Sequence, residues 1–369
     1  MRTPIVERLG AEFPIFAFSH CRDVVAAVTN AGGIGVLGAL GDTPEELEIE
    51  LRWIEDQVGD KPYGVDIVLP ATTLEDRQEG SAAEITAKLE ALIPAEHRAF
   101  AASVLREHGV EPGDDDHATF TTGLKSTERR LVDVVLAHKA RVLVNALGAM
   151  PRDIVDRCHD AGVLCGGLVG SPQHAARQVA NGVDFVVAQG TEAGGHTGDI
   201  STMVLIPQVV DLVGDVPVLA AGGIASGRQM AAALALGAQG VWTGSLWMTV
   251  TEASTEPVLK AKLIAASSSD TARSKAMTGK PNRLLKSAWT GAWDDPSTPT
   301  PLGWPLQLQV SQPAMRAWTR SGNQALATTS IGQGIGMINE VRASRRVVLD
   351  LVEEFIETCE KLGRFVNGD

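Results

Sequence analysis

The sequence predicts an α/β protein: a TIM (β/α)8 barrel with a helical insertion after the third strand and a C-terminal lid. Eight short apolar or β-branched runs recur along the chain, and segments of helical periodicity separate them. Eight β/α units in roughly 250 residues match a closed barrel, whereas an open doubly wound sheet seldom needs so many strands. The predicted strands are Pro14–Phe18, Ile34–Leu37, Tyr63–Leu69, Arg141–Asn145, Val163–Gly166, Phe185–Gln189, Pro217–Ala220 and Gly240–Thr243.

Helix start and stop signals lie between these runs. The sequence TPEE that begins at Thr43 has the cap, proline and acid order of a helix start, so we expect a helix over Thr43–Val58. A second helix is expected over Ser226–Leu236, because Ser226 is a good cap and Gly237 follows the end. Glycine precedes several other predicted strands, where a helix C-cap explains it.

Two segments do not fit the β/α repeat. Residues 70–126 interrupt the unit after the third strand with polar, partly helical sequence, and residues 265–330 follow the eighth strand as a lid-like segment. We expect both at the catalytic rim of the barrel. The chain then divides into a barrel over 1–264, the lid over 265–330 and a C-terminal part over 331–369, with an amphipathic helix at Ile338–Leu362. The lid carries four of the seven tryptophans: Trp289, Trp293, Trp304 and Trp318.

Composition excludes several classes of function. With 44% hydrophobic and 21% charged residues, a chain of 369 residues can bury a sizeable core, so disorder is excluded as its main character. The net charge of −13 without a long basic tract argues against nucleic acid and anionic membranes as partners, and favours a small soluble one. No apolar run reaches the roughly 18 residues of a spanning helix and no apolar signal segment follows Met1, so we expect a cytoplasmic protein.

Cysteine and acidic residues give no sign of a metal site. The four cysteines, Cys21, Cys158, Cys165 and Cys359, lie far apart and form no C-x-x-C pair, so neither a disulfide framework nor a zinc site is predicted. The acidic run at Asp114–His117 is predicted as a solvated loop, because consecutive acidic side chains cannot all face one ion. We therefore expect no bound metal.

Two glycine-containing turns follow the seventh and eighth predicted strands. Gly222 and Gly223 end the seventh, and Thr243, Gly244 and Ser245 end the eighth. In TIM barrels these two loops commonly bind phosphate, since residues without Cβ let backbone N–H groups face the anion and a helix start adds positive charge. If only one such glycine turn were present, the need for a tight turn would be enough to explain it. Two such turns at these two strands favour a phosphate-bearing ligand.

The segment Gln189–Gly198, QGTEAGGHTG, follows the sixth predicted strand. Catalytic groups of TIM barrels lie on such loops, and the glycines beside His196 let a ligand approach the backbone closely. Imidazole accepts a proton near neutral pH, as abstraction from a weakly acidic carbon requires, so His196 is the candidate base. The alternative is a histidine that only hydrogen-bonds a turn. Glu192 is either a second acid or a charge on the rim.

A basic run without an intervening acid stands out in this acidic chain. Its positive charges would meet a phosphorylated substrate or a nicotinamide phosphate, or they form a solvated helix face, which is the more common arrangement. The residues are Arg273, Lys275, Lys280, Arg283 and Lys286.

Three stretches resemble the nitronate monooxygenases, formerly called 2-nitropropane dioxygenases, and their relatives the flavin-dependent enoyl-acyl-carrier-protein reductases. They are Gln189–Gly198, Ala220–Gly244 (AAGGIASGRQMAAALALGAQGVWTG) and, more loosely, Ala31–Gly38 (AGGIGVLG), within a similarity over about residues 10–290. The resemblance implies a TIM barrel with one non-covalently bound FMN. No GxGxxG fingerprint follows a strand to hold an adenylate half, which favours FMN over FAD.

The resemblance also implies roles for individual residues. His196 matches the histidine assigned as catalytic base in nitronate monooxygenases, and Gln189 and Gly194, with the adjacent Gly195, are implied to contact the flavin. The FMN phosphate is implied to lie on the two glycine turns, that is on Gly222, Gly223, Thr243, Gly244 and Ser245.

Two places depart from the family pattern. After the first strand the family usually has Ala-Pro-Met or Gly-Gly-Met beside the flavin, where this chain has Ala17, Phe18 and Ser19. At Ser19-His20-Cys21 we expect contact with the flavin through the backbone and no thiol nucleophile. The third strand usually carries asparagine where Asp66 stands. A phenyl ring and a carboxyl group near the isoalloxazine would change the shape of the pocket and the redox potential of the flavin.

Three functions follow as expectations. The first is an FMN-dependent oxidoreductase of nitronate monooxygenase type, in which His196 deprotonates a nitroalkane and O2 reoxidises the flavin. The second is an NAD(P)H-dependent reductase of enoyl- or related acyl-thioesters carried by CoA or a carrier protein. The third is a flavin-binding protein without turnover. The sequence does not fix the physiological substrate, and it leaves a homodimer open.

Overall fold

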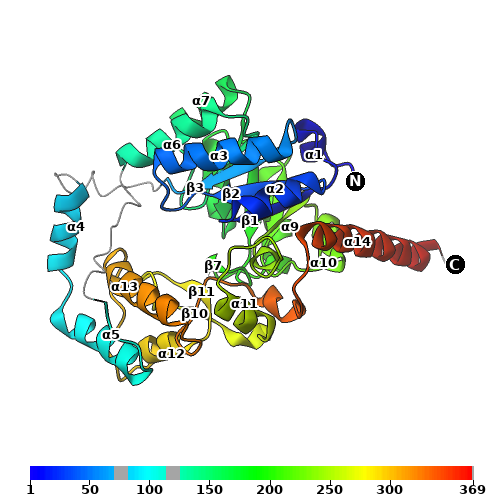
Figure 1. Ribbon diagram of the computed structural model, residues 1–369. Helices are drawn as coiled ribbons and strands as arrows, with labels where there is room; N and C mark the ends of the chain where they lie inside the picture. The colour runs from blue at the N-terminus through cyan, green and yellow to red at the C-terminus, as the bar shows by residue number, and fades with distance from the viewer. Residues whose placement is uncertain (70–81, 114–124, 368–369) are drawn as a thin grey trace.

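The computed structural model describes residues 1–69, 82–113 and 125–367. Eight parallel strands close into a barrel in the order β1-β2-β3-β4-β5-β6-β8-β9, with helices around it (Figure 1). Each strand overlaps one of the eight predicted runs, so the predicted TIM barrel is confirmed. The barrel strands are β1 (Ile15–Ser19), β2 (Ile34–Gly38), β3 (Gly64–Ile67), β4 (Val142–Asn145), β5 (Leu164–Val169), β6 (Phe185–Gln189), β8 (Val218–Ala221) and β9 (Gly240–Thr243).

Helices connect the strands and build the segments appended to the barrel. The acidic run at Asp114–His117 lies outside the described residues. The helices are α1 (Pro4–Leu9), α2 (Arg22–Asn30), α3 (Pro44–Val58), α4 (Ala82–Ala91), α5 (Ala95–Glu107), α6 (Lys125–Ala137), α7 (Arg152–Asp160), α8 (Pro172–Ala180), α9 (Thr202–Val213), α10 (Gly227–Ala235), α11 (Pro257–Ile264), α12 (Ala288–Asp294), α13 (Leu306–Ser321) and α14 (Ser344–Asn367), with short 3-10 helices η1 (Ser245–Met248), η2 (Ser268–Asp270) and η3 (Gln333–Met337).

Local sequence signals set the ends of α3 and α10 as predicted. The Thr43 side chain accepts a hydrogen bond from the Glu46 N–H, and the Glu46 carboxylate accepts one from the Thr43 N–H, which makes a capping box. At α10, the Ser226 hydroxyl accepts a hydrogen bond from the backbone N–H of Gln229. Gly237 follows this helix with a φ of +97°, a conformation that glycine adopts without strain.

The interior of the barrel is packed with side chains and closed at its N-terminal end. Inward-facing residues of the strands form one apolar cluster that includes Phe16, Phe185 and Trp242, and the α1 residues Ile5 and Leu9 belong to the same cluster. Helix α1 therefore plugs the end at which the strands begin. The other end, where the strands finish, is the one at which TIM barrels place their active sites.

A small second sheet lies at the end where the barrel strands finish. It is antiparallel and has the order β10-β11-β7, with β7 (Gly195–His196), β10 (Thr271–Ser274) and β11 (Asn282–Leu285). The sequence analysis did not predict this sheet, because a two-residue strand between glycines leaves no alternation to detect. Its consequence is that the loop after β6 is fixed to the segment predicted as a lid.

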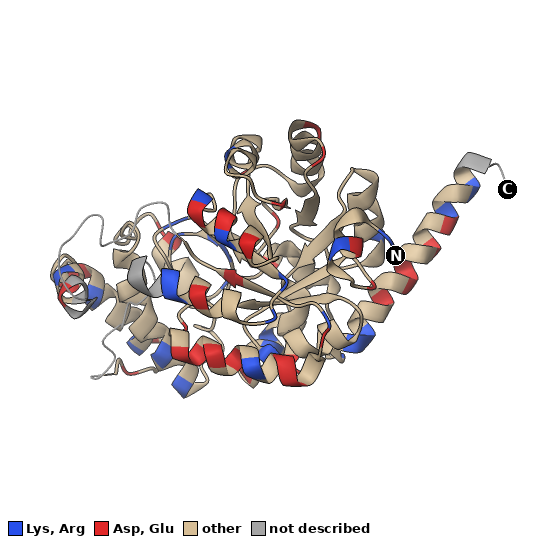
Figure 2. Ribbon diagram, turned by 90° about the horizontal axis from the view of Figure 1, so that it is seen from above, with Lys and Arg blue, Asp and Glu red and all other residues tan. Residues whose placement is uncertain are grey.

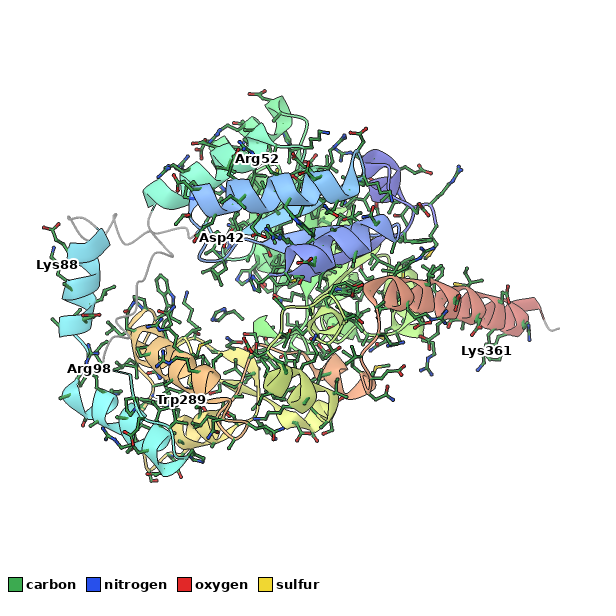
Figure 3. The ribbon with its side chains drawn as sticks, in the orientation of Figure 1. Asp42, Arg52, Lys88, Arg98, Trp289 and Lys361 are labelled. Carbon is green, nitrogen blue, oxygen red and sulfur yellow. The ribbon has the colours of Figure 1, made fainter. Side chains whose placement is uncertain are left out.

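The insertion after β3 and the segment after β9 share an apolar core of their own. Val104 and Leu105 of α5 belong to one cluster with Trp289, Trp293 and Trp318. The ring of Trp289 lies 5.7 Å from that of Trp293 and 5.2 Å from that of Trp318, among the side chains of α12 and α13 (Figure 3). The two segments thus pack on each other beside the barrel, while the boundaries at residues 264 and 330 stay a prediction.

The C-terminal helix begins later than predicted. The sequence analysis placed it at Ile338–Leu362, and α14 spans Ser344–Asn367, packed on α10 and α2. The Glu252 carboxylate accepts hydrogen bonds from the Ser344 N–H at 2.9 Å and from its hydroxyl at 2.8 Å. This cap fixes the first residue of the helix, and it comes from a residue far away in the sequence.

Charged residues of both signs are interspersed along the surface helices (Figure 2). Of the helices that the structure describes, none is long and apolar enough to cross a membrane.

Candidate active site

The turn after β8 requires glycine at two successive positions. Gly222 and Gly223 have φ values of +109° and +70°, in the region that side chains with a Cβ rarely adopt. A Cβ on Gly222 would lie 2.6 Å from the hydroxyl oxygen of Thr202, which is too close for any side chain. The pair is therefore a conformational necessity, and side chains hold its carbonyl oxygens: the Thr202 hydroxyl donates to that of Gly222 at 3.0 Å and the Gln229 amide to that of Gly223 at 2.7 Å.

Backbone donors are available where the phosphate was predicted. Within the part of the chain that the structure describes, the N–H groups of Gly223, Ile224 and Gly244 make no hydrogen bond to another residue. They belong to the turns after β8 and β9, and α10 begins three residues beyond Ile224, so its N-terminus adds positive potential. Three donors beside a helix start fit a phosphate group.

A glycine-rich segment after the lid joins the two turns to the loop after β6. The Gly332 N–H donates to the Ser245 hydroxyl oxygen at 2.9 Å, and the Gln333 N–H donates to the Glu192 carbonyl oxygen at 2.8 Å. A Cβ on Gly334 would lie 3.1 Å from the Gly223 carbonyl oxygen. The sequence analysis missed this segment, although three glycines at alternate positions, 332 to 336, were a readable signal for close backbone approach.

Glu192 has neither of the roles that the sequence left open. Its carboxylate accepts hydrogen bonds from the Thr202 N–H at 2.9 Å and from the Thr202 hydroxyl at 2.7 Å, at the first residue of α9. A carboxylate at a helix N-terminus is held by the free N–H groups and by the helix dipole. Glu192 is therefore a helix cap that fixes the loop after β6, and it is neither a free acid nor a solvated rim charge.

His196 is held at one ring nitrogen and free at the other. Its Nε2 lies 2.8 Å from the Thr278 hydroxyl oxygen. The Lys280 carbonyl oxygen, 3.2 Å from that hydroxyl, can accept its proton, and in this arrangement the His196 Nε2–H donates to the hydroxyl oxygen. Nδ1 then carries the lone pair. The sequence analysis did not single out Thr278, which lies far from His196 in the chain.

The environment of His196 favours the neutral imidazole. The side chain is exposed to solvent, yet its pKa is lowered, first by desolvation in the surrounding protein and then by the positive charge of Lys280. A neutral ring with a free Nδ1 lone pair can accept a proton at pH 7. The paired strands β7 and β11 hold the ring in place, with His196 opposite Asn282.

The basic run does not form one solvated face. It lies on and around the β10–β11 hairpin, and its arginines bind the loop after β6: Arg283 is buried and donates from Nε to the Thr191 carbonyl oxygen at 2.8 Å, and Arg273 forms an ion pair with Asp199. Lys280 lies over the Trp304 ring, 4.8 Å from its centre. The expectation of a helix face is wrong, because pairing with β7 makes this segment a hairpin.

The residues at the end of β1 divide between two faces. Phe18 points into the barrel, where its ring lies 6.3 Å from that of Trp242, and a Cβ on Gly244 would lie 3.9 Å from the Phe18 ring. The Ala17 side chain points the other way, into the core between strands and helices. The Ser19 hydroxyl accepts a hydrogen bond from the Cys21 N–H at 3.1 Å. Phe18 is thus the side chain of this trio that lines the barrel axis.

Gln189 and Gly194 are brought together at the end of β6. The Gln189 amide donates to the Gly194 carbonyl oxygen at 3.5 Å, which is a long hydrogen bond that leaves most of the donor capacity of the amide free. Gly194 itself is packed against the glycine-rich segment, since a Cβ there would lie 2.7 Å from the backbone of Ile331. These contacts pack the loop after β6 against the glycine-rich segment that begins after Ile331.

Asp66 is a buried carboxyl group on the inner face of β3. It is 4% exposed, and its Oδ1 has no hydrogen-bond partner among the described residues. Desolvation raises its pKa well above the ordinary range, although a hydrogen bond from the Ala146 backbone opposes this shift. A buried carboxyl group with so few partners is most stable as the neutral acid. In this protonated form the carboxyl group can donate a hydrogen bond, which a carboxylate cannot.

We expect Asp66→Asn to stabilise the protein increasingly as the pH rises. The folded-state pKa of Asp66 lies above its unfolded value of about 3.9, so the unfolded state binds fewer protons and wild-type stability falls as the pH rises through that interval. Asparagine does not titrate, so the stability difference should grow by about 1.4 kcal/mol per pH unit between the unfolded-state and the folded-state pKa of Asp66, and level off above the latter. Urea unfolding of both proteins at pH 5 to 7 measures it; a difference that stays constant with pH would exclude a neutral Asp66.

Several known proteins are similar to this chain in sequence and in fold. A curated Mycobacterium tuberculosis protein, provisionally described as a monooxygenase, is 52% identical over 98% of both chains. Among solved structures, a nitroalkane oxidase from Streptomyces ansochromogenes has a TM-score of 0.80 with 26% identity over 98% of this chain and 100% of that one. FabK from Thermotoga maritima has a TM-score of 0.74 with 26% identity over 99% of both. The sequence profile of the nitronate monooxygenase family matches residues 14–354, and the chain belongs to this family of oxidoreductases.

Proposed function

We propose that this protein is an FMN-dependent oxidoreductase of nitronate monooxygenase type. The observation that carries the proposal is the joining of two parts at the end of the barrel: the turns with free backbone donors at Gly223, Ile224 and Gly244, and the loop that presents His196. FMN, when bound, would accept electrons from a nitronate and pass them to O2. The turns would hold its phosphate, with Gln189, Gly194 and Gly195 nearby.

His196 would act on the substrate as the base. Its Nδ1 would take the proton from the carbon next to the nitro group, while Thr278 holds the Nε2–H and fixes the ring. Lys280, whose charge acts at His196, would favour the anionic nitronate over the neutral nitroalkane. The same charge keeps the imidazole neutral between turnovers. Phe18, Asp66 and Trp242 would shape the inner side of the flavin site from the barrel axis.

The alternative is an NAD(P)H-dependent reductase of enoyl- or related acyl-thioesters. The two reactions differ in their electron donor, so oxygen consumption with a preformed alkyl nitronate and no nicotinamide tests the proposal. We expect steady oxygen consumption under these conditions. Consumption that requires NADPH would favour the reductase, and retained FMN without either activity would favour a flavin-binding protein without turnover.

A further inference from the structure

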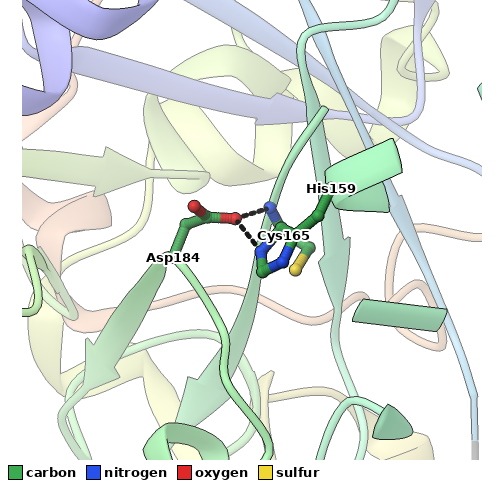
Figure 4. Close-up of side chains that lie close together, drawn as sticks. All are labelled: His159, Cys165 and Asp184. Atoms are coloured by element: carbon green, nitrogen blue, oxygen red, sulfur yellow. Dashed lines mark hydrogen bonds and ion pairs between the residues drawn. The ribbon is translucent and has the colours of Figure 1, made fainter. Parts of the chain in front are cut away.

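Three potential metal ligands of different chemistry converge at the end of the barrel where the strands begin. His159 lies in the last turn of α7, Cys165 is the second residue of β5, and Asp184 directly precedes β6. The ligand atoms of their imidazole, thiol and carboxylate groups all lie within 4.8 Å of one another (Figure 4). The loops that carry His196 and the phosphate turns follow the other ends of the strands. This cluster is therefore separate from the proposed flavin site.

The carboxylate of Asp184 is held in one orientation. Its Oδ2 lies 3.1 Å from the His159 Nε2 and accepts a hydrogen bond from the Cys165 N–H at 2.9 Å, and its Oδ1 lies 2.9 Å from an Arg8 nitrogen. Figure 4 shows the imidazole and the carboxylate meeting beside the Cys165 thiol. Hydrogen bonds that fix ligating groups in this way are what orients the ligands of metal sites in proteins.

Two of the three groups face solvent. His159 and Asp184 line an open cavity of about 470 Å³, and Cys165 is buried next to them. His159 also lies at the C-terminal end of α7, where free carbonyl groups and the helix dipole favour a cation.

From this arrangement we propose that His159, Cys165 and Asp184 bind a divalent transition metal of the Zn²⁺ class, with solvent in the fourth position. Thiolate and imidazole ligands select Zn²⁺ and Co²⁺ over Mg²⁺ and Ca²⁺, and three protein ligands with an open position are a known zinc arrangement. Metal–ligand bonds of about 2.0 to 2.3 Å require the three ligand atoms, which lie within 4.8 Å of one another, to move closer together, and exposed His159 can rotate towards the other two. No spacing pattern in the sequence predicts this site, because Cys165 and Asp184 approach each other only when β5 and β6 pair.

Binding must release a proton. The Cys165 thiol loses its proton to solvent as its sulfur bonds to the metal, and the imidazole exchanges its contact with Asp184 for the metal. Affinity should therefore rise about tenfold per pH unit below the pKa of the thiol. That pKa is raised by a hydrogen bond with Cys158, by burial and by Asp184. Cys158 of α7 is the other titratable group in contact with the Cys165 thiol. Arg8 of α1 and Arg141, ahead of β4, also face the cluster, and the positive charges of these two arginines lower its affinity for a cation.

Co²⁺ titration of the purified flavoprotein tests the proposal, because thiolate-bound Co²⁺ has a charge-transfer absorption that aqueous Co²⁺ lacks. Cys359→Ser serves as the background, since Cys359 is the exposed thiol. We expect saturation at one equivalent, loss of the band in Cys165→Ala, and affinity weakened at least about tenfold in His159→Ala. His174→Ala, another exposed histidine at the start of α8, is the matched control and should bind as the background does.

The variants separate metal binding from folding. His159 is exposed, so His159→Ala should keep its flavin and its circular dichroism even if Cys165→Ala folds poorly. Cys158→Ala should keep the charge-transfer band, since Cys158 contacts the ligand sulfur without being a ligand. The absence of the band at equimolar Co²⁺, its survival in Cys165→Ala, or equal affinities of His159→Ala and His174→Ala would each overturn the proposal, whatever the enzyme oxidises.

Discussion

Gly244→Asp should purify with little or no FMN, whereas Gly244→Asn should retain it. The added carboxylate would face the phosphate dianion, and two unit charges about 4 Å apart repel by about 4 kcal/mol near a protein surface, or about three orders of magnitude in affinity. Space is not the obstacle, because a Cβ on Gly244 has only the Phe18 ring at 3.9 Å. The ratio of flavin absorbance to protein after gel filtration measures the effect.

The corresponding substitution in the turn after β8, Gly222→Asp, changes both the charge and the local structure. Gly222→Asp should also lose FMN, but a side chain there would collide with the Thr202 hydroxyl and adopt a φ of +109°, so loss of flavin would be mixed with loss of structure. The Asp and Asn variants at Gly244 are nearly the same size, and charge is their main difference. Undiminished FMN in both Gly222→Asp and Gly244→Asp would exclude a phosphate at these turns.

His196→Asn should lose activity on a neutral nitroalkane by roughly 10²-fold or more, and keep much of its activity on the matching nitronate. The base is needed to deprotonate a carbon acid and is superfluous for a substrate that arrives deprotonated. Because the environment lowers the His196 pKa, wild-type activity on the nitroalkane should persist below the ordinary imidazole pKa of about 6.5. Steady-state rates on the paired substrates across pH measure both effects.

Other outcomes of this assay identify other roles. Equal losses on nitroalkane and nitronate would contradict a base role even if His196 proves essential. Slowed enoyl-thioester reduction with continued flavin reduction by NADPH would indicate the reductase. Thr278→Val should also lose more activity on the nitroalkane than on the nitronate, but the loss should be smaller than in His196→Asn. It should shift the acidic limb of the pH profile, because Thr278 positions the ring and fixes the proton on Nε2 without touching substrate.

The barrel and the glycine turns after β8 and β9 could be predicted from the sequence because both depend on local signals. Each strand is a short apolar run, and the two residues of the capping box of α3, Thr43 and Glu46, are close together in the sequence. Gly222 and Gly223 fall where a barrel of this kind places its phosphate loops, and their positive φ values are a need that only glycine meets well.

The rest of the site depends on contacts between distant residues, which periodicity and spacing do not encode. The pairing of β7 with β11 joins residues more than 80 positions apart, and with it come Thr278 beside His196 and the basic hairpin. The cap of α14 by Glu252 spans 92 positions. Glu192 could be read as an acid in a loop, but its bond to Thr202 appears only once α9 folds back onto that loop.

Anaerobic mixing of the purified yellow protein with an alkyl nitronate, and separately with NADPH, tests the central claim most directly. The nitronate should bleach the flavin absorbance within the turnover time. NADPH should leave the absorbance unchanged, because in the proposed reaction the nitronate itself donates the electrons to the flavin. Rapid bleaching by NADPH while the nitronate leaves the flavin yellow would contradict the assignment as a nitronate-oxidising enzyme.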